Sequence, residues 1–477
     1  MAFFPYFIIL FSLLERNLNF ELSEEKISIL NEMIEKQMKQ AKISTLGLII
    51  TNKNSTIYQN IYSDNEKINE DTPFIIGSVS KTFTSLGILK LNIDLNKTLE
   101  NYDLDKYINK EDRKSITIAE LLNHTSGLGS FSSKINKESK GNCSYSNYGF
   151  ALLGKIIELE SQKNYDIYIK EKIFDPLNMS NAGAKYHEGI VESYDNFLGF
   201  NTKYTGLKSE MGDGFYVPAG FISTSIEDMG KYLRYFLDTD SDDYRNYISQ
   251  MIEGSVNYEY NIDYGMGMFI QKKNNETLYF HPGDTNSFSS YLSIFPDLDL
   301  GIFAVINSND LFCSIPKADI FDSIQSFIAF DTMGYIHSNL FFYVHFSLDM
   351  IFLIVIAIPL TYLIITIVRK CKKKKYSWFI GRKGIIIFIV DLILLIALPV
   401  ALISILYTIN AEIKYAIDNT KDLKFVLFTF SSALILTFII KLIYVIVFNR
   451  YFKSLGSDAT KKIDAIDLNY MGFENDN

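Results

Sequence analysis

Apolar residues in the N-terminal two thirds of the chain recur at spacings that predict helices and short strands. In residues 24–42 they recur every three or four positions from Ile27 to Met38, which is typical of a helix with one buried face. Further helices are predicted from Ser78 onwards and at 146–159 and 225–237. Short apolar runs bounded by turns predict strands at 46–51, 56–62, 264–271, 276–281, 288–295 and 300–307. Strands near both ends with helices between them indicate one mixed α/β domain over residues 22–338.

The C-terminal third has a different pattern, with long apolar stretches at 346–368, 385–407 and 425–448. Each is long enough to cross about 30 Å of hydrocarbon at ~1.5 Å per residue. The run 369–375 holds six basic residues in seven, and an excess of Lys and Arg marks a cytoplasmic loop. These features predict three transmembrane helices and a multi-pass protein of the cell membrane.

The same pattern predicts the order of segments along the chain. Residues 1–21 are apolar and are expected to be a signal peptide or an N-terminal anchor, with a buried helix as the alternative. Either export signal would place the domain at 22–338 outside the cytoplasm. The predicted segments after it are transmembrane helix 339–368, basic cytoplasmic loop 369–384, transmembrane helix 385–407, outside loop 408–424, transmembrane helix 425–448 and cytoplasmic tail 449–477.

Composition and charge narrow the class of protein. The 37 Phe and 31 Tyr residues exclude a disordered chain. A net charge of −9 with one dense basic cluster argues against nucleic acid as a partner and favours a lipid bilayer. Three cysteines are too few for a disulfide scaffold, although a Cys143–Cys313 bridge stays open. The five histidines are scattered and form no zinc motif, so we expect no metal and no cofactor.

The strongest candidate for chemistry is Ser78 with Lys81, in the sequence Gly-Ser-Val-Ser-Lys. A serine at a helix start lies where free backbone N–H groups favour negative charge. A lysine three residues later lies on the same face, and desolvation there lowers its pKa so that it can take the serine proton. Taken alone, the pair is more typical of a capped, solvent-exposed helix start.

Two weaker patterns follow in the chain. Tyr145 and Asn147 open the next predicted helix, where a tyrosine can transfer protons and an amide can bind a substrate amide. His281, Gly283 and Asp284 end a predicted strand, where a glycine lets a ligand approach and the next backbone N–H can form part of an oxyanion hole. Each pattern alone is also typical of core packing or a helix cap. Their order along the chain makes the set specific.

The ordered set S-x-x-K, Y-x-N and H-x-G resembles the class C β-lactamases and the penicillin-binding-protein-like serine hydrolases. The segments Leu-Leu-Asn-His-Thr-Ser-Gly-Leu at 121–128, Pro-Ala-Gly-Phe-Ile-Ser-Thr at 218–224 and Tyr-Gly-Met-Gly at 264–267 support this resemblance, which covers about residues 22–330. It implies a mixed, mainly antiparallel sheet with a helical subdomain. His124, in the first of these segments, is expected to be structural.

The resemblance also implies roles for the candidate residues. Ser78 would be the acylated nucleophile, while Lys81 and Tyr145 would share the proton transfer. Asn147 would bind the substrate amide, and His281 would replace the lysine of the family's Lys-Thr-Gly form. Gly283 would let the substrate lie along the strand, and the backbone N–H groups of Ser78 and Asp284 would form the oxyanion hole. Asp284 departs from the small residue that is common at this position, as does Pro282.

The whole arrangement predicts a membrane-anchored serine acyl hydrolase acting on a peptide or peptidoglycan-like small substrate. An exported catalytic domain followed by three spans is similar to the membrane-bound peptidases that remove an N-acyl-D-asparagine leader, as in colibactin maturation. We therefore expect a peptidase or carboxypeptidase for D-amino-acid or N-acylated peptides. The alternatives are a sensor that binds β-lactams or peptides, and a β-lactamase or esterase.

Overall fold

The computed structural model describes residues 22–197, 200–309 and 314–332, together with short stretches between 347 and 443. The chain divides into two units, Met1–Phe346 and Ser347–Asn477. Among the described residues, no helix has the length and apolarity that crossing a membrane requires. Residues 1–21 and large parts of the three predicted spans lie outside the described residues, so the N-terminal signal and the transmembrane helices stay predictions.

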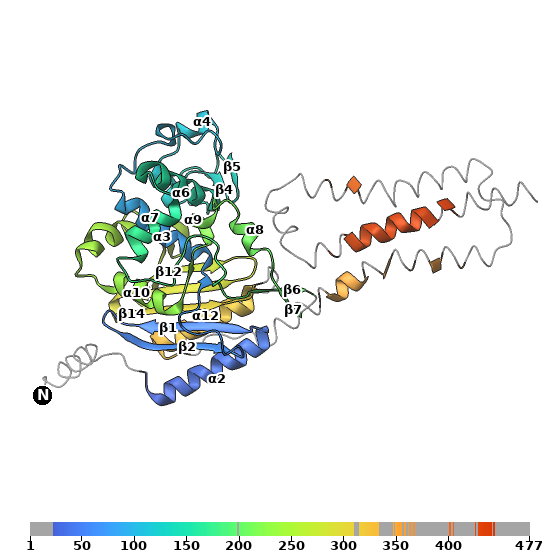
Figure 1. Ribbon diagram of the computed structural model, residues 1–477, viewed down its shortest axis with the longest axis horizontal. Coiled ribbons are helices and arrows are strands. Elements are labelled where there is room, and N and C mark those ends of the chain that lie inside the picture. The colour runs from blue at the N-terminus through green and yellow to red at the C-terminus, as the bar shows by residue number, and fades with distance from the viewer. Residues whose placement is uncertain are drawn as a thin grey trace, which may run out of the picture. The chain divides into compact units, whose positions relative to one another are not determined.

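One eight-stranded sheet forms the centre of the first unit (Figure 1). Its strands are, in spatial order, β2 (Thr56–Ser63), β1 (Thr45–Thr51), β14 (Leu300–Ile306), β13 (Ser289–Phe295), β12 (Glu276–Asp284), β11 (Phe269–Lys273), β10 (Ile262–Tyr264) and β9 (Val256–Glu259). Early and late parts of the chain meet where β1 pairs with β14, with Leu46 opposite Ile306. Every pairing in this sheet is antiparallel. The expected mainly antiparallel sheet is therefore confirmed, and this sheet contains none of the parallel pairs that a mixed sheet would have.

The strand predicted at 264–271 is wrong as a single element, because a turn divides it into β10 and β11. The N–H of Gly265 donates to the carbonyl of Met268 over 2.8 Å, and Gly267 has a left-handed φ of 81°. A Cβ at Gly267 would lie 2.9 Å from the carbonyl oxygen of Lys81. Glycine is therefore required where this turn touches the helix that carries Lys81.

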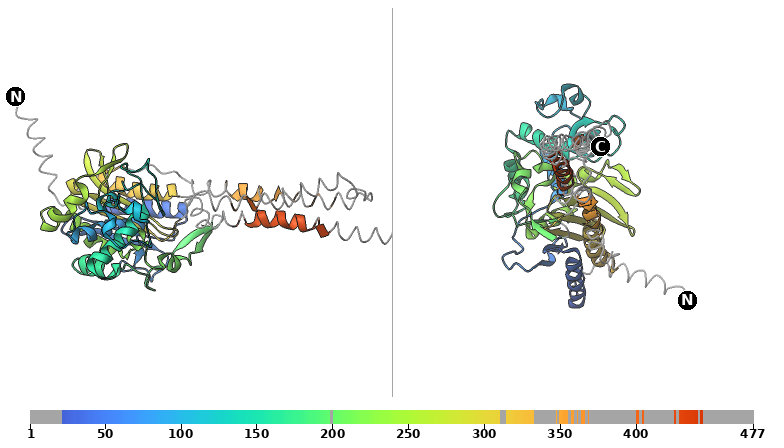
Figure 2. Two further views of the ribbon diagram at one scale, coloured as in Figure 1. Left: turned by 90° about the horizontal axis from the view of Figure 1, so that it is seen from above. Right: turned by 90° about the vertical axis from the view of Figure 1, so that its right-hand side faces the viewer.

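Helices cover both faces of the sheet (Figure 1). The helices α2 (Glu24–Ala41) and α12 (Ser314–Phe330) pack on one face, and α10 (Ile226–Leu237) packs on the other. Successive residues of β1 point to opposite faces of the sheet, as strand geometry requires. Leu48 packs in the core formed with α2 and α12, here called the first core. Ile49 packs in the core formed with α10, here called the second core. Figure 2 shows α2 apart from the helices of the opposite layer. The helix α12 was not predicted from the sequence.

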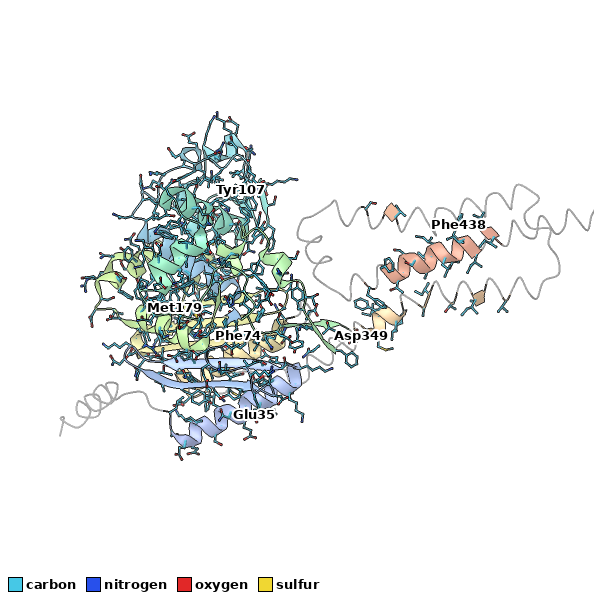
Figure 3. The ribbon with its side chains drawn as sticks, in the orientation of Figure 1. Glu35, Phe74, Tyr107, Met179, Asp349 and Phe438 are labelled. Atoms are coloured by element: carbon cyan, nitrogen blue, oxygen red, sulfur yellow. The ribbon has the colours of Figure 1, made fainter. Side chains whose placement is uncertain are left out.

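The helical subdomain lies beyond α10 and joins the second core. It comprises α3 (Ser80–Lys90), α4 (Lys110–Arg113), α5 (Ile118–Leu122), α6 (Asn147–Ser161), α7 (Tyr165–Ile169), α8 (Leu207–Met211), α9 (Val217–Gly220) and α11 (Ser249–Ile252). Three short antiparallel pairs accompany these helices: β3 (Phe74–Ile75) with β8 (Ser223–Thr224), β4 (Leu128–Gly129) with β5 (Ser132–Ile135), and β6 (Tyr194–Phe197) with β7 (Phe200–Lys203). Phe74 and Met179 are buried in this core, whereas Tyr107 lies in its outer part and stacks on Phe215 with ring centroids 4.8 Å apart (Figure 3).

Serine caps fix the starts of three predicted helices. The side chains of Ser23, Ser146 and Ser225 accept hydrogen bonds from backbone N–H groups three residues later, which begin α2, α6 and α10. Such caps satisfy N–H groups that have no partner inside the helix. The cap at Ser146 has a functional consequence, because it fixes the backbone between Tyr145 and Asn147.

Candidate active site

Ser78 lies in a single tight turn, η2 (Gly77–Val79), between β3 and α3. Gly77 has a left-handed φ of 53°, and a Cβ there would lie 2.4 Å from the backbone nitrogen of Asp284. Only glycine permits this approach. The turn therefore presses the backbone of Ser78 against the end of β12 and leaves the Ser78 side chain half-buried.

Lys81 lies in the first turn of α3 and is fully buried. Its Nζ lies 3.0 Å from Ser78 Oγ, 2.6 Å from Asn147 Oδ1 and 2.6 Å from the carbonyl oxygen of Ala219. No carboxylate is among these partners. Burial therefore lowers the pKa of Lys81 well below its usual value, because removal from water disfavours the ammonium form.

Tyr145 lies beside this pair, with its ring centroid 4.7 Å from Lys81 Nζ. Burial raises the pKa of Tyr145 above its usual value, and a side-chain hydrogen bond with Ser78 lowers it by less. The phenol is thus favoured over the phenolate. Asn147, the first residue of α6, accepts from Lys81 through Oδ1 and keeps its amide Nδ2 3.5 Å from Ser130 Oγ.

The opposite wall of the site is β12. His281 is fully buried; its Nδ1 lies 2.6 Å from the Pro282 carbonyl and must donate to it, so Nε2 accepts from the Tyr264 hydroxyl at 3.3 Å. Burial, reinforced by Lys81, lowers the pKa of His281 to about 3. Histidine therefore stays neutral here. At Gly283 a Cβ would lie 2.2 Å from the Ile76 carbonyl oxygen, so glycine is needed for this strand to reach the Ser78 turn.

Asp284 is the last residue of β12 and is exposed to solvent. Its carboxylate Oδ1 accepts from Ser289 Oγ at 2.6 Å and from Asn309 Nδ2 at 3.2 Å. Although the residue as a whole is exposed, protein atoms surround its carboxylate. Their desolvation raises the pKa of Asp284, against the lowering effects of Ser289, Lys317 and Asn309. The structure therefore brings the other six predicted site residues together around Ser78, and it places a carboxylate at the end of the strand.

Other groups of the site carry no motif of their own. The Ala219 carbonyl holds Lys81, but a backbone acceptor leaves no signal in side-chain patterns. His124 lies under Tyr145 with ring centroids 4.4 Å apart, and its Nδ1 accepts from the N–H of Ser146 over 3.2 Å. It supports the site, in keeping with the structural role expected for it. Cys143 is a free thiol in the described part of the chain; Cys313 lies outside it, so the pairing of these two cysteines stays open.

On an antiparallel sheet flanked by helices, Lys81 lies one turn after Ser78 with β12 alongside, an arrangement in which a serine can act as a nucleophile and a lysine as its base. The chain belongs to the beta-lactamase family, whose sequence model matches residues 30–316. Members with this fold are serine hydrolases.

The chain is similar to Protein flp of Staphylococcus aureus (strain MRSA252), with 26% identity over 337 residues. That match covers 62% of this chain and 65% of the relative, so the chain spans just under two thirds of the relative's length. Among solved structures, it is similar to a class C beta-lactamase from Rhodobacter sphaeroides, with 16% identity and a TM-score of 0.54, covering 63% of this chain and 99% of that one. It is also similar to a D-stereospecific amidohydrolase from Streptomyces, with 17% identity, a TM-score of 0.52 and the same coverage. At these identities the solved structures show the fold alone.

Proposed function

We propose that the protein is a membrane-anchored serine acyl hydrolase that cleaves peptides with N-acylated or D-configured residues. One observation carries the chemistry: the buried Nζ of Lys81 lies 3.0 Å from Ser78 Oγ. A lysine with a lowered pKa can hold a free electron pair near neutral pH. Lys81 then donates to Asn147 and Ala219 and accepts the proton of Ser78.

Acylation follows from this arrangement. Ser78 Oγ attacks the substrate carbonyl carbon as its proton passes to Lys81 Nζ, directly or through the Tyr145 hydroxyl. The backbone N–H groups of Ser78 and Asp284, which Gly77 and Gly283 bring together, stabilise the oxyanion. The C–N bond then breaks, the amine leaves with the proton, and the acyl group stays on Ser78. Water hydrolyses this ester, releasing the acid and restoring the serine hydroxyl.

The D-configured or N-acylated substrate rests on two supports. One solved structure of the same fold is a D-stereospecific amidohydrolase. The Asn147 side chain lies beside Lys81, with Nδ2 3.5 Å from Ser130 Oγ, where an amide can bind a substrate amide. Anchoring is supported by the basic run at 369–375 between two long apolar stretches. An anchored site would act on peptides of the cell wall or on exported peptides.

The test is turnover by the full-length protein purified in detergent, measured by mass spectrometry. The substrates are N-acyl-D-Asn amides, D-Ala-D-Ala peptides and their L-counterparts, with Ser78→Ala as the control. We expect cleavage of one D-series, lost in Ser78→Ala. Equal cleavage by Ser78→Ala would refute the assignment of Ser78.

The same preparation separates the alternatives. A stable mass adduct of a penicillin on Ser78 without turnover would replace the peptidase by a sensor. Rapid hydrolysis of nitrocefin or short esters, with no peptide cleavage, would replace it by a β-lactamase or esterase. Sedimentation of the protein with the membrane fraction after an alkaline wash tests the anchor, and its release into the supernatant would contradict it.

A further inference from the structure

Two hydroxyl groups of α3 hold the short helix α9 beside the active-site lysine. Ser80 Oγ accepts from the backbone N–H of Ile222 at 3.0 Å, and Thr84 Oγ1 donates to the Pro218 carbonyl at 2.7 Å. Because Ser80 and Thr84 are four residues apart, they lie on one face of the helix. Their partners flank Ala219 in the chain, and the Ala219 carbonyl is the backbone acceptor for the lysine. The position of this carbonyl is therefore set from both sides.

A tyrosine lies behind Thr84. The Tyr165 hydroxyl lies 2.6 Å from Thr84 Oγ1, and a threonine hydroxyl has a single proton to donate. Since that proton goes to the Pro218 carbonyl, Tyr165 donates to Thr84. These groups are buried, so water does not compete for their hydrogen bonds. On the other side of α9, a Cβ at Gly154 of α6 would lie 2.2 Å from Pro218 Cγ. The helix α9 is thus held between α3 and α6.

The position of the Ala219 carbonyl decides where the free electron pair of Lys81 points. A neutral amine has two N–H groups and one electron pair, and Lys81 Nζ has three partners. Asn147 Oδ1 and the Ala219 carbonyl, both at 2.6 Å, only accept hydrogen bonds. When they take both N–H groups, the electron pair points at the third partner, Ser78 Oγ at 3.0 Å. A displaced Ala219 carbonyl would let Nζ rotate and turn the electron pair away from the serine.

We infer that Thr84 is a positioning residue, which aims the electron pair of Lys81 at the nucleophile. It acts by fixing α9 and with it the Ala219 carbonyl, and Tyr165 supports it from behind. This inference rests on the proposed function and adds a residue outside the three motifs to its proton transfer. A misplacement of about 1 Å can cost on the order of 10²-fold in rate. The substrate itself lies along β12, so loss of the Thr84 hydroxyl should slow acylation without weakening substrate binding.

The experiment measures acylation in a single turnover, with the full-length protein in detergent in excess over the p-nitrophenyl ester of N-acetyl-D-alanine. Release of p-nitrophenol at several protein concentrations gives the acylation rate constant and the dissociation constant of the ester separately. Urea unfolding measures the stability of each variant in parallel. The variants are Thr84→Ser, Thr84→Val and Thr84→Val/Tyr165→Phe. The double variant also removes the tyrosine hydroxyl, which Thr84→Val would leave buried without its partner, so it separates rate from stability.

The same helix offers a matched control. Thr82 Oγ1 donates to the Val79 carbonyl at 2.8 Å and accepts from the Tyr232 hydroxyl at 2.9 Å, and both side chains are fully buried. This pair has the same chemistry, but its carbonyl lies at the start of α3 and not in α9. Thr82→Val and Thr82→Val/Tyr232→Phe should therefore change stability in the same way and keep the acylation rate constant within about threefold of the wild type.

Thr84→Val should lower the acylation rate constant about tenfold or more and change the dissociation constant by less than about twofold, whereas Thr84→Ser should stay within about threefold of the wild type in both. Thr84→Val/Tyr165→Phe should recover stability but not rate. An unchanged rate constant in Thr84→Val, its recovery together with stability in the double variant, or an equal loss in Thr82→Val would overturn the inference while leaving the acyl hydrolase standing. Absence of p-nitrophenol release by the wild type, with no acyl adduct on Ser78, would instead overturn the proposed function.

Discussion

The two walls of the candidate site work in different ways. The helical wall, formed by α3 and the start of α6, contributes side chains: Ser78, Lys81 and Asn147 meet within 3.0 Å at one buried nitrogen. The wall formed by β12 contributes mainly its backbone, because Gly283 and the turn at Gly77 let two main chains touch. The helical wall thus supplies reactive side chains, and the strand wall supplies the backbone contacts that shape the site. Substitutions on the helical wall should stop the chemistry, whereas those on the strand should change geometry, stability and choice of substrate.

The largest effect is expected for Lys81→Met. Removal of the base should lower kcat/KM on the order of 10³-fold. The fold should be kept, since methionine has similar volume and removes a buried polar group that is costly to desolvate. Steady-state kinetics with circular dichroism would check both points. Lys90→Met is the matched control on the same helix, because Lys90 pairs with Asp243 at 2.9 Å away from the site. Equal losses in both variants would show that the loss comes from disturbing α3 and not from removing the base.

Gly283→Ala should distort the strand wall, because the added methyl group has no room. The added methyl group would overlap the Ile76 carbonyl and Ser290 Oγ, so β12 must shift away from the Ser78 turn. We expect a loss of about 2–3 kcal/mol in the free energy of unfolding and a clear fall in kcat. Gly149→Ala in α6 is the control, since its Cβ would have no atom closer than 3.5 Å. Urea unfolding and kinetics of both variants measure the difference, and an unchanged Gly283→Ala enzyme would contradict the close contact.

This contrast also explains what the sequence could predict. Spacing identifies side-chain chemistry on helices, so Ser78, Lys81 and Asn147 were found, and the caps at Ser146 and Ser225 marked helix starts to within a residue. Short apolar runs bounded by turns identified the strands. In β1 every residue is buried, with Leu48 in one core and Ile49 in the other. Local patterns do not show which distant strands pair. The order of the three motifs along the chain nevertheless indicated one family.

Other features could not be predicted, for physical reasons. The acceptor from Ala219 is a backbone carbonyl, which every residue possesses. The direction of the Tyr145 pKa shift depends on burial, which outweighs the hydrogen bond with Ser78 and cannot be judged before the fold is known. The network behind Asp284 requires Asn309 and Lys317, which lie after β14, to meet the end of β12. The strand predicted at 264–271 missed a turn because its glycines were assigned to the strand.

His281 on the strand wall is neutral in the folded protein, so the pH dependence of the free energy of unfolding tests its environment. Its pKa is about 3 in the folded protein and near 6.5 when unfolded, so only the unfolded chain gains a proton between these values. The stability that this group contributes is present above pH 6.5 and is lost as pH falls toward 3. It should amount to about 2 kcal/mol between pH 7 and pH 5. His281→Gln should flatten the stability profile by that amount, whereas His187→Gln, at a partly exposed site, should change it less. Identical profiles for the wild type and His281→Gln would show that His281 is not held neutral.

The smallest effect is expected at a side-chain hydrogen bond from β13, the strand beside β12, to the segment just before the Ser78 turn. Ser290 on β13 donates from Oγ to the Ile76 carbonyl at 2.8 Å, two residues before the nucleophile. Ser290→Ala should cost about 1 kcal/mol of unfolding free energy and lower kcat/KM several-fold, because the Ser78 turn loses a tether that its glycines cannot replace. Ser293→Ala is the control on the same strand: Ser293 accepts from Gln325 at 2.8 Å, so a similar loss of stability should leave kcat/KM unchanged. Urea unfolding and ester kinetics on both variants separate the two effects. If the two serines proved equivalent in activity, backbone contact alone would hold the walls together, and the strand would matter through Gly77 and Gly283 only.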